Sequence, residues 1–476
     1  MSKNKIVIVL LFALASLLIV SLFSYKILDV PMGLTVDETA FGYNAALLAH
    51  HGRDENGRFM PFFVLSINGQ DWRQPVTQYY LALLFKIFGP SLFLLRFSSV
   101  IITVISGFLI FKLAKLFFKP LPALAPVLLF FTTPLVMIQS HLGLDNIMPV
   151  PLTILWLYGL IRFSKKDKKT YLISSALFLS LSFYSYKGMR AVFPVWLFLS
   201  LAYLFLLKTN RLKNIIFFSL VCLPFMAIVP LLNRAYPGAI LGGANPKVDS
   251  IYNLVYPYLS SFDPTFLFIR GDSTPFHSTG KHGMMLLSSL PFFIIGLFAP
   301  FEKRQKLFII LSFFSAPLLY GLVDSAHRAS RLMCLIPPYV LIATIGFSHL
   351  FKNKFGKITT LILVILISVN YLDFIKFYWQ DYRLYSQSFL GDLKPYLSFE
   401  QLKKKSQSLN LTPYVADDIQ SDFFQSIYFP NGISVIDRDL VPPPNSILLT
   451  NRLQIDGMNR LDHQMSYYYL QVKQND

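Results

Sequence analysis

The chain is 476 residues long, 54% hydrophobic and only 14% charged, with a formal net charge of +18. Because soluble domains carry about 25% charged residues, this composition argues against a soluble protein and indicates a polytopic membrane protein. The two cysteines, Cys222 and Cys334, both lie in apolar runs, which excludes a disulfide framework and a CxxC metal site.

Apolar runs close to the roughly 20 residues that a membrane helix needs recur along the whole chain. The first run follows Lys3 and Lys5 and has no small-residue cleavage site behind it, so we expect an uncleaved span rather than a signal peptide. We predict eleven spans, at about residues 6–25, 91–111, 121–139, 147–161, 171–187, 191–207, 214–232, 284–301, 307–323, 332–351 and 358–372.

The charges separate according to these spans. If the N-terminus is cytoplasmic, the segments on that side hold nineteen basic residues and two acids, which accounts for nearly all of the net charge. This is the positive-inside pattern of membrane proteins, so the basic composition does not require a nucleic-acid partner. The same topology places the loops 26–90 and 233–283 and the tail 373–476 on the outer side.

The outer segments have their own predicted structure. Residues 76–88 are too few to cross a bilayer and include Lys86, so we expect a helix that lies along the outer membrane surface. In the tail we predict a helix over 389–409 and short strands at 413–416, 433–436, 446–450 and 467–472. We therefore expect a membrane domain over 1–372 and a small extracytoplasmic α/β domain over 373–476.

Two adjacent carboxylates, Asp37 and Glu38, follow the first span. Ionisable groups at membrane depth are costly and usually mark a substrate path or a proton-transfer site. Neighbouring residues point in different directions, so one carboxylate could act as a general base while the other is turned away. The alternative is a structural role, in which Thr35 or Asp37 caps a helix that starts near Glu38.

Basic residues stand on the outer side, where positive charge is normally sparse. Arg73 follows Trp72 in the first outer loop, and Lys187 and Arg190 lie between the fifth and sixth spans. Arg and Lys bind phosphate through charge-assisted hydrogen bonds, so we predict an anionic lipid head group as their partner. For Arg73 the alternative is an interfacial anchor. Asp145, between the third and fourth spans, is an acid at the same surface.

A further basic group lies beside the tenth span. His327 and Arg328 follow Asp324 and precede Arg331, which suggests another anion contact or, alternatively, salt bridges to Asp324 or to the tail. The histidines of the chain show no zinc-site spacing. Walker and Rossmann glycine motifs are absent, so the sequence does not support a soluble nucleotide site.

Five stretches together resemble one family, the polyprenyl-phosphate-dependent glycosyltransferases with the GT-C fold. These are bacterial relatives of the protein O-mannosyltransferases and of the aminoarabinose transferase that modifies lipid A. The stretches are GLTVDETAFGYNAALLAHHGRDENGRFMP, DWRQPVTQYYLALLFKIFGPSLFLLRFSS, SFYSYKGMRAVFP, FDPTFLFIRGDSTPFHSTGKHGMMLLSSLPFFIIGLF and AHRASRLMCLIPPYVLIATIG. The resemblance covers roughly residues 30–350.

The resemblance implies an all-α polytopic membrane protein in which Asp37 is the general base. It implies that Arg73 contacts the donor phosphate, although Gln74 stands where the family has a proline. The substrate-binding residues that we predict on this basis are Glu38, Arg73, Asp145, Lys187, Arg190, Arg270, His277, His327 and Arg328.

The predicted function is inverting transfer of a sugar from an undecaprenyl-phosphate donor to an extracytoplasmic acceptor, which could be a protein, lipid A or a wall glycan. We expect no required cofactor, with a divalent metal as the alternative, and a multi-pass protein of the inner cell membrane. The alternatives are an oligosaccharide ligase or polymerase that uses diphosphate-linked donors, and a lipid-sugar flippase or transporter without chemistry. A transporter would carry charges near the bilayer midplane, whereas these charges lie at the outer surface.

Overall fold

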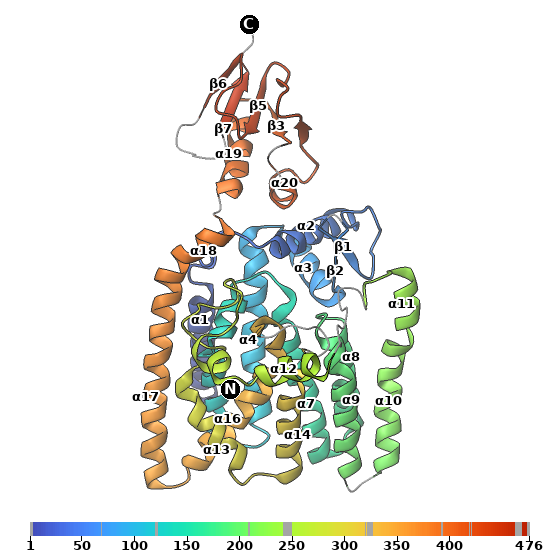
Figure 1. The fold of residues 1–476 in the computed structure, drawn as a ribbon, viewed down its shortest axis with the longest axis vertical. Coiled ribbons are helices and arrows are strands. Elements are labelled where there is room, and N and C mark those ends of the chain that lie inside the picture. Colours follow the sequence, from blue (N-terminus) through green and yellow to red (C-terminus); the bar gives the residue numbers. More distant parts are fainter. Residues whose placement is uncertain are drawn as a thin grey trace.

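The structure is a computed structural model that describes residues 3–67, 69–119, 122–207, 210–240, 250–318, 320, 327–391, 394–417, 419, 421–461 and 469–473. It is mostly helical, at 66% of residues. Figure 1 shows a large helical body with a small α/β domain above it. We call the described part of this small domain, residues 394–473, the tail domain.

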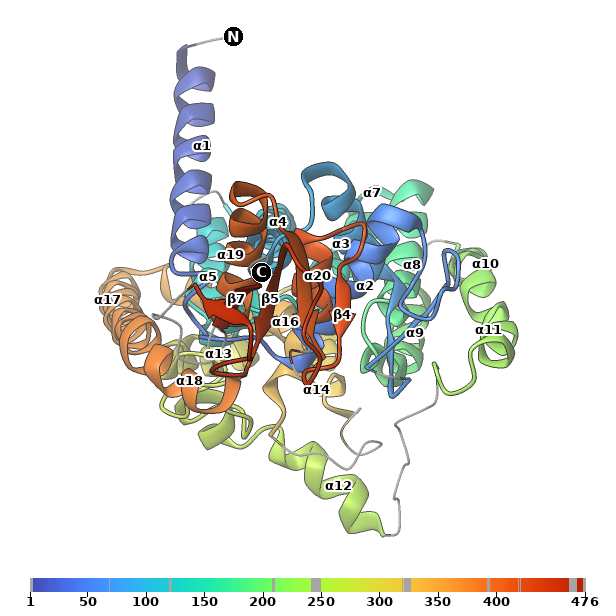
Figure 2. The ribbon, with the colours of Figure 1, turned by 90° about the horizontal axis from the view of Figure 1, so that it is seen from above.

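The helical body is built from helices that run along its long axis and shorter helices between them. Its helices are α1 (Lys3–Ser24), α4 (Leu92–Ala114), α5 (Ala125–Phe131), α6 (Pro134–Ser140), α7 (Pro149–Lys166), α8 (Lys169–Phe183), α9 (Met189–Leu206), α10 (Arg211–Ala227), α11 (Val229–Ala235), α12 (Ile251–Ser260), α13 (Leu290–Phe298), α14 (Lys303–Ser315), α16 (Ile336–Leu350) and α17 (Lys354–Phe377). Figure 2 shows α1 projecting from the side of the body.

The helical body is that of a membrane protein, but the expected count of eleven spans is not confirmed. A described helix lies in each predicted run, and six described segments are long and apolar enough to cross a membrane, or seven if the pair bent by 57° at Thr132–Thr133 is one span. Helices α13 and α14 have only 9 and 13 residues. At 1.5 Å per residue, 13 residues cover about 20 Å of a hydrocarbon core about 30 Å thick.

The first long polar segment forms a cap over one end of the body. It contains α2 (Val36–His51), an antiparallel hairpin of β1 (Val64–Ser66) and β2 (Asp71–Arg73), and α3 (Pro75–Phe88). In α3, Pro75 stands at the first helical position, where its missing N–H is tolerated. The buried face of α3 includes Leu81 and Phe85, while Lys86 is exposed, as an interfacial helix requires.

The opposite end of the body carries the basic links. The connections from α9 to α10 and from α16 to α17 lie at the end that is remote from the tail domain in Figure 1. Arg211 opens α10, and Lys352 and Lys354 lie at the start of α17. We call this the basic end, and the end that α2 and α3 cover the cap end.

The break between the body and the tail domain comes later than expected. We predicted a boundary after residue 372, but α17 passes through it to Phe377 and continues through a π-helical turn into α18 (Arg383–Leu390). The chain then turns at Gly391, which has a φ of 74°, before α19 (Lys394–Ser408) begins. The single helix expected over 389–409 is therefore divided, because a positive φ is incompatible with a continuous right-handed helix.

The tail domain is a mixed five-stranded sheet with helices beside it. The strand order is β4 (Ser434–Ile436), β3 (Thr412–Ala416), β5 (Ser446–Thr450), β7 (Tyr469–Lys473) and β6 (Met458–Arg460). Strand β3 is parallel to β4 and β5, whereas β7 is antiparallel to β5 and β6. Helix α20 (Asp422–Tyr428) lies between this sheet and α2 (Figure 1).

The contact between α20 and α2 is close. The buried ring of Phe423 lies so near Gly42 that a Cβ atom there would come within 2.5 Å of it. Asp422 is close enough to Tyr43 to act on it electrostatically. The tail domain thus rests on the helix whose first turn carries Asp37.

Candidate active site

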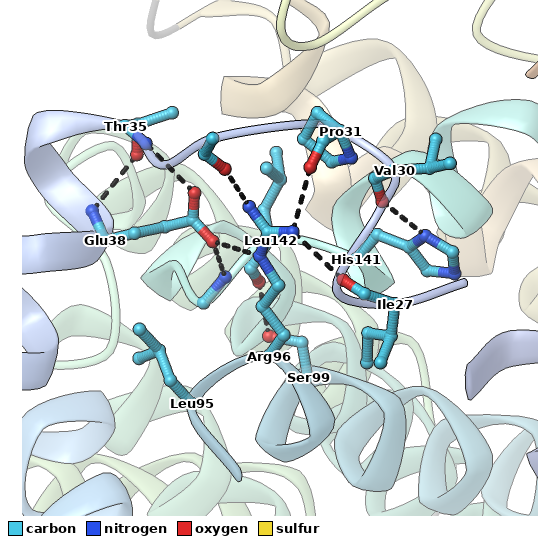
Figure 3. Close-up of polar contacts among 12 residues, drawn as sticks. Ile27, Val30, Pro31, Thr35, Glu38, Leu95, Arg96, Ser99, His141 and Leu142 are labelled. Carbon is cyan, nitrogen blue, oxygen red and sulfur yellow. Dashed lines mark hydrogen bonds and ion pairs between the residues drawn. The ribbon is translucent and has the colours of Figure 1, made fainter. Parts of the chain in front are cut away.

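A buried ion pair holds the loop that leads into α2. The Nε atom of Arg96, on α4, lies 3.0 Å from Oε1 of Glu38, and both side chains are completely buried (Figure 3). The same Oε1 accepts a hydrogen bond of 3.0 Å from the backbone N–H of Gly143. Arg96 also donates to the carbonyls of Ile27 and Pro31, both at 2.9 Å. Its Nη2 also donates to the carbonyl of Gly33, so one guanidinium fixes three points of the loop between α1 and α2.

Glu38 also completes the N-terminal cap of α2. The Thr35 hydroxyl accepts from the Glu38 N–H at 3.0 Å, and Glu38 Oε2 accepts from the Thr35 N–H at 3.1 Å. This reciprocal capping box satisfies two backbone donors of the first turn. Both carboxylate oxygens of Glu38 are thus used inside the protein, which corrects our prediction that Glu38 contacts substrate. The structural alternative, with Thr35 as the cap, describes Glu38 better.

Asp37, one residue earlier, faces outward. Its side chain is 51% exposed, and its Oδ1 lies 2.8 Å from Nη1 of Arg73, whose own side chain is only 5% exposed. Arg73 ends β2, where its Nε donates to Ser66 Oγ of β1 at 2.7 Å. The Phe41 ring lies 4.7 Å from the guanidinium carbon. The hairpin and α2 together hold this arginine in one orientation.

One donor of Arg73 has no partner. Among the residues that the structure describes, the buried Nη2 atom of Arg73 makes no hydrogen bond. A buried donor without an acceptor costs about 1–3 kcal/mol, and more when it is charged. The position is therefore suited to an acceptor atom from outside the protein, such as a phosphate oxygen.

Asp71 links Arg73 to Lys187. Its Oδ2 lies 3.2 Å from Arg73 Nη1, and its Oδ1 forms an ion pair with Lys187 Nζ. Asp145 opens a short 3-10 turn before α7, is half-buried, and interacts electrostatically with Arg73, Asp37, Lys187 and Asp71. We call these five residues, Asp37, Asp71, Arg73, Asp145 and Lys187, the charged cluster.

Arg190 is bound by three acceptors of the protein itself. Its Nη1 donates to the carbonyls of Ala239 and Ile240 at 2.6 and 2.7 Å, and its Nη2 donates to Oε1 of Gln74. Three acceptors from the protein thus bind Nη1 and Nη2 and tie the segment after α11 to the start of α3. The buried Nε makes no hydrogen bond among the described residues, so the predicted phosphate contact of Arg190 stays a prediction. Gln74, which departs from the family pattern, is the residue that Arg190 binds.

His277 belongs to a network of buried polar groups. His277 Nδ1 lies 2.9 Å from Gln139 Nε2, and Asn146 Nδ2 donates to Gln139 Oε1 at 3.3 Å. Burial lowers the pKa of His277 to about 3, with smaller contributions from Arg328 and Arg331, so the ring is neutral at pH 7. This network adjoins the charged cluster in the chain, because Asn146 follows Asp145.

The remaining predicted residues lie outside the charged cluster. His327 Nε2 is 3.6 Å from Asp263 Oδ2, and its ring packs near Phe266. Arg328 Nη1 donates to Thr274 Oγ1 in the same region. Arg270 is exposed at the end of a π-helical turn. No described interaction joins these side chains to Asp37. Asp324 lies outside the described residues.

Sequence reasoning missed several residues of the site. Asp71 was not predicted as a site residue, and only the hairpin register, with Ser66 opposite Asp71, brings its carboxylate to both cations. Tyr186 interacts electrostatically with Asp145 and Arg331. Arg96 carried a signal in the sequence, because an arginine inside an apolar run is costly and needs a partner. Within the described residues, no three His, Cys, Asp or Glu side chains gather as metal ligands.

Comparison with known proteins identifies the fold. Residues 73–233 match the model of the dolichyl-phosphate-mannose-protein mannosyltransferase family. The structure resembles ArnT from Cupriavidus metallidurans bound to undecaprenyl phosphate, with a TM-score of 0.56 and 10% identity over 99% of this chain and 98% of that chain. The chain has the GT-C glycosyltransferase fold.

Two further structures share the GT-C fold. ArnT from the same organism in the apo state matches with a TM-score of 0.56 and 10% identity over 98% of both chains. The oligosaccharyltransferase of Archaeoglobus fulgidus in the apo form matches with a TM-score of 0.50 and 11% identity, over 87% of this chain and 63% of that chain. A comparison with the curated proteins finds no sequence match. The GT-C resemblance predicted from the motifs is confirmed.

Proposed function

We propose that this chain transfers a sugar from a polyprenyl-phosphate donor to an acceptor hydroxyl or phosphate outside the cytoplasm. The observation that carries the proposal is the unpaired Nη2 of buried Arg73 beside the exposed carboxylate of Asp37. A phosphate-binding donor group and a candidate base thus meet on one surface of a membrane-embedded fold. The GT-C likeness supports the proposal at the level of the fold.

In this proposal Arg73 and Lys187 hold the donor phosphate. Arg73 presents Nη2 to a phosphate oxygen, and Lys187, which is 36% exposed, supplies a second cation from the other side of Asp71. Cations placed where negative charge develops lower the barrier of a group transfer. The ArnT structure that this chain resembles is bound to undecaprenyl phosphate, and we assign the same lipid class to this donor.

Asp37 is the proposed general base. Its carboxylate takes the proton from the acceptor hydroxyl, and the acceptor oxygen forms a bond to the anomeric carbon. The bond from that carbon to the phosphate oxygen breaks, and its electron pair leaves on the phosphate. Attack from the face opposite the leaving group inverts the anomeric configuration. The half-exposed position of Asp37 supports this role, because an acceptor must be able to reach it.

The orientation of the chain follows from its charges. We propose that the basic end faces the cytoplasm, which the positive-inside pattern supports, and that the charged cluster and the tail domain lie on the outer face of the inner membrane. The tail domain rests on α2 through Phe423 and Gly42, so we propose that it helps to select the acceptor. No residue role in this scheme requires a cofactor.

The test is donor consumption by purified protein in lipid, with synthetic short-chain polyprenyl-phosphate sugars and an extract of envelope acceptors. Asp37→Asn should lower turnover by about 10²–10⁴-fold, the usual contribution of a general base. The matched control is Asp29→Asn, because Asp29 is an exposed acid of the preceding loop. Full activity of Asp37→Asn would overturn the assignment of the base. Consumption of diphosphate-linked donors alone would indicate a ligase or polymerase, and translocation without consumption would indicate a flippase.

A further inference from the structure

A groove opens on the side of the body that is remote from the charged cluster. It has a volume of about 590 Å³ and lies between α17 and the segment 268–288. Figures 1 and 2 both show α17 at the edge of the body, away from α2 and α3. No residue of the charged cluster lines it.

The position of the groove along α17 gives its depth in the membrane. Helix α17 starts at Lys354, at the basic end. With a rise of 1.5 Å per residue, Leu366 lies about 18 Å and Asp373 about 28 Å from that start. Because the hydrocarbon core is about 30 Å thick, the groove lies in the outer half of the bilayer and reaches its outer surface. Leu366 and Val369, on the wall formed by α17, are 48% and 58% exposed, as expected of side chains that face lipid tails.

The two ends of the groove differ in polarity. The deeper part is apolar, with Leu366 and Val369 on α17 and Met285 and Leu286 opposite. Asn370 marks the transition, where its Oδ1 accepts from Ser288 Oγ at 3.1 Å.

The outer part of the groove carries Lys281, His282 and Asp373. His282 Nε2 lies 3.2 Å from Asp373 Oδ2, and the exposed Lys281 has its Nζ 4.4 Å from the centre of the Phe377 ring. Burial lowers the pKa of His282, which favours the neutral form of its ring. The outer part therefore holds one cation and one carboxylate.

We infer that this groove binds a glycerophospholipid of the outer leaflet with a phosphoethanolamine head group. The phosphate lies at Lys281, the primary ammonium lies at Asp373, and one acyl chain follows the apolar wall toward Leu366. One cation beside one carboxylate matches a zwitterionic head group, because the phosphate pairs with Lys281 and the ammonium pairs with Asp373. An anionic lipid would leave Asp373 facing a net negative head group, which raises the free energy of binding. This inference does not depend on the proposed glycosyltransferase activity.

Native mass spectrometry of the whole chain, released from nanodiscs, measures which lipid is retained. The nanodiscs contain equal amounts of phosphatidylethanolamine and phosphatidylglycerol with matched acyl chains, and undecaprenyl phosphate is added in a second series. We expect about fivefold preference for phosphatidylethanolamine, which is the size that one interfacial ion pair supplies. Asp373→Asn should remove this preference, because only the ammonium of phosphatidylethanolamine meets the carboxylate. Lys281→Gln should lower the retention of both lipids, because both carry the phosphate. Lys376→Gln, an exposed lysine of the same helix as Asp373, is the matched control and should leave both the preference and the retention unchanged.

A second measurement on the unaltered chain does not depend on the folding of variants. A photoactivatable phosphatidylethanolamine should crosslink to peptides that contain 268–288 and 366–377. Equal retention of phosphatidylglycerol, or preferential retention of undecaprenyl phosphate in the groove, would overturn the inference. Crosslinks that avoid both peptides would overturn it as well.

Discussion

Nη1 of Arg73 lies 2.8 Å from Oδ1 of Asp37, so the proposed base and the proposed phosphate ligand are paired with each other. In the proposed site the donor phosphate binds the other terminal nitrogen, Nη2, which has no partner among the described residues. One guanidinium would therefore hold the base and the leaving group side by side.

The proposed phosphate contact predicts a selective kinetic effect at Lys187. Lys187→Gln should raise KM for the lipid donor by about tenfold or more, because hydrogen bonds to charged groups contribute about 1.5–3 kcal/mol. Initial rates over a range of donor concentrations measure this effect. The control is Lys86→Gln, an exposed lysine of α3 outside the charged cluster. An unchanged KM for Lys187→Gln would remove Lys187 from the donor site.

The two adjacent acids should differ in what their loss does. Glu38→Gln leaves Arg96 buried without a counter-charge, and such a break usually costs about 3–5 kcal/mol. We expect a clear fall in the thermal unfolding temperature of Glu38→Gln in detergent, measured by fluorescence-detected size exclusion. Asp37→Asn removes a half-exposed carboxylate and should unfold close to the temperature of the unaltered chain. Equal unfolding temperatures for the two variants would contradict the structural role of Glu38.

The contact between the tail domain and α2 can be tested with two substitutions, of which the second compensates for the first. Gly42→Ala places a methyl group within 2.5 Å of the Phe423 ring, so it should loosen the tail domain and increase its cleavage by a protease. Phe423→Leu in the same chain makes room and should restore resistance. If the Gly42→Ala variant resists the protease as well as the unaltered chain does, α20 does not pack against Gly42.

The buried imidazole of His277 predicts a pH dependence of stability. Its pKa is lowered from 6.5 to about 3 in the folded protein, mainly by burial. Between these values the unfolded chain binds the proton and the folded chain does not, so stability is full above pH 6.5 and is lost as the pH falls toward 3. His277→Gln should reduce this loss. Unfolding temperatures from pH 7.5 to pH 4 measure it, with the exposed His51→Gln as control. If unfolding temperature depends on pH identically in the His277→Gln and His51→Gln variants, His277 does not cause the loss of stability.

Much of the fold could be predicted because it depends on local patterns. Apolar runs and the positive-inside bias can be recognised from residues that are neighbours in the chain. Described helices lie in all eleven predicted runs. The number that cross a membrane could not be predicted, because an apolar run does not show where its helix ends, and α13 and α14 have only 9 and 13 residues. The Asp37–Glu38 pair and Arg73 also stand out locally, as charges beside a span.

The division of roles among these charges came from contacts between distant segments. The sequence indicated that one of two adjacent acids would be turned away, but only Arg96, 58 positions from Glu38, decides which one is buried. The sequence likewise does not indicate that Arg190 donates to the carbonyls of Ala239 and Ile240, which lie about 50 positions away in the chain. A charge near a membrane can be recognised from its neighbours in the chain. Whether the protein satisfies it or leaves it for a ligand depends on which acceptors the fold brings within hydrogen-bonding distance.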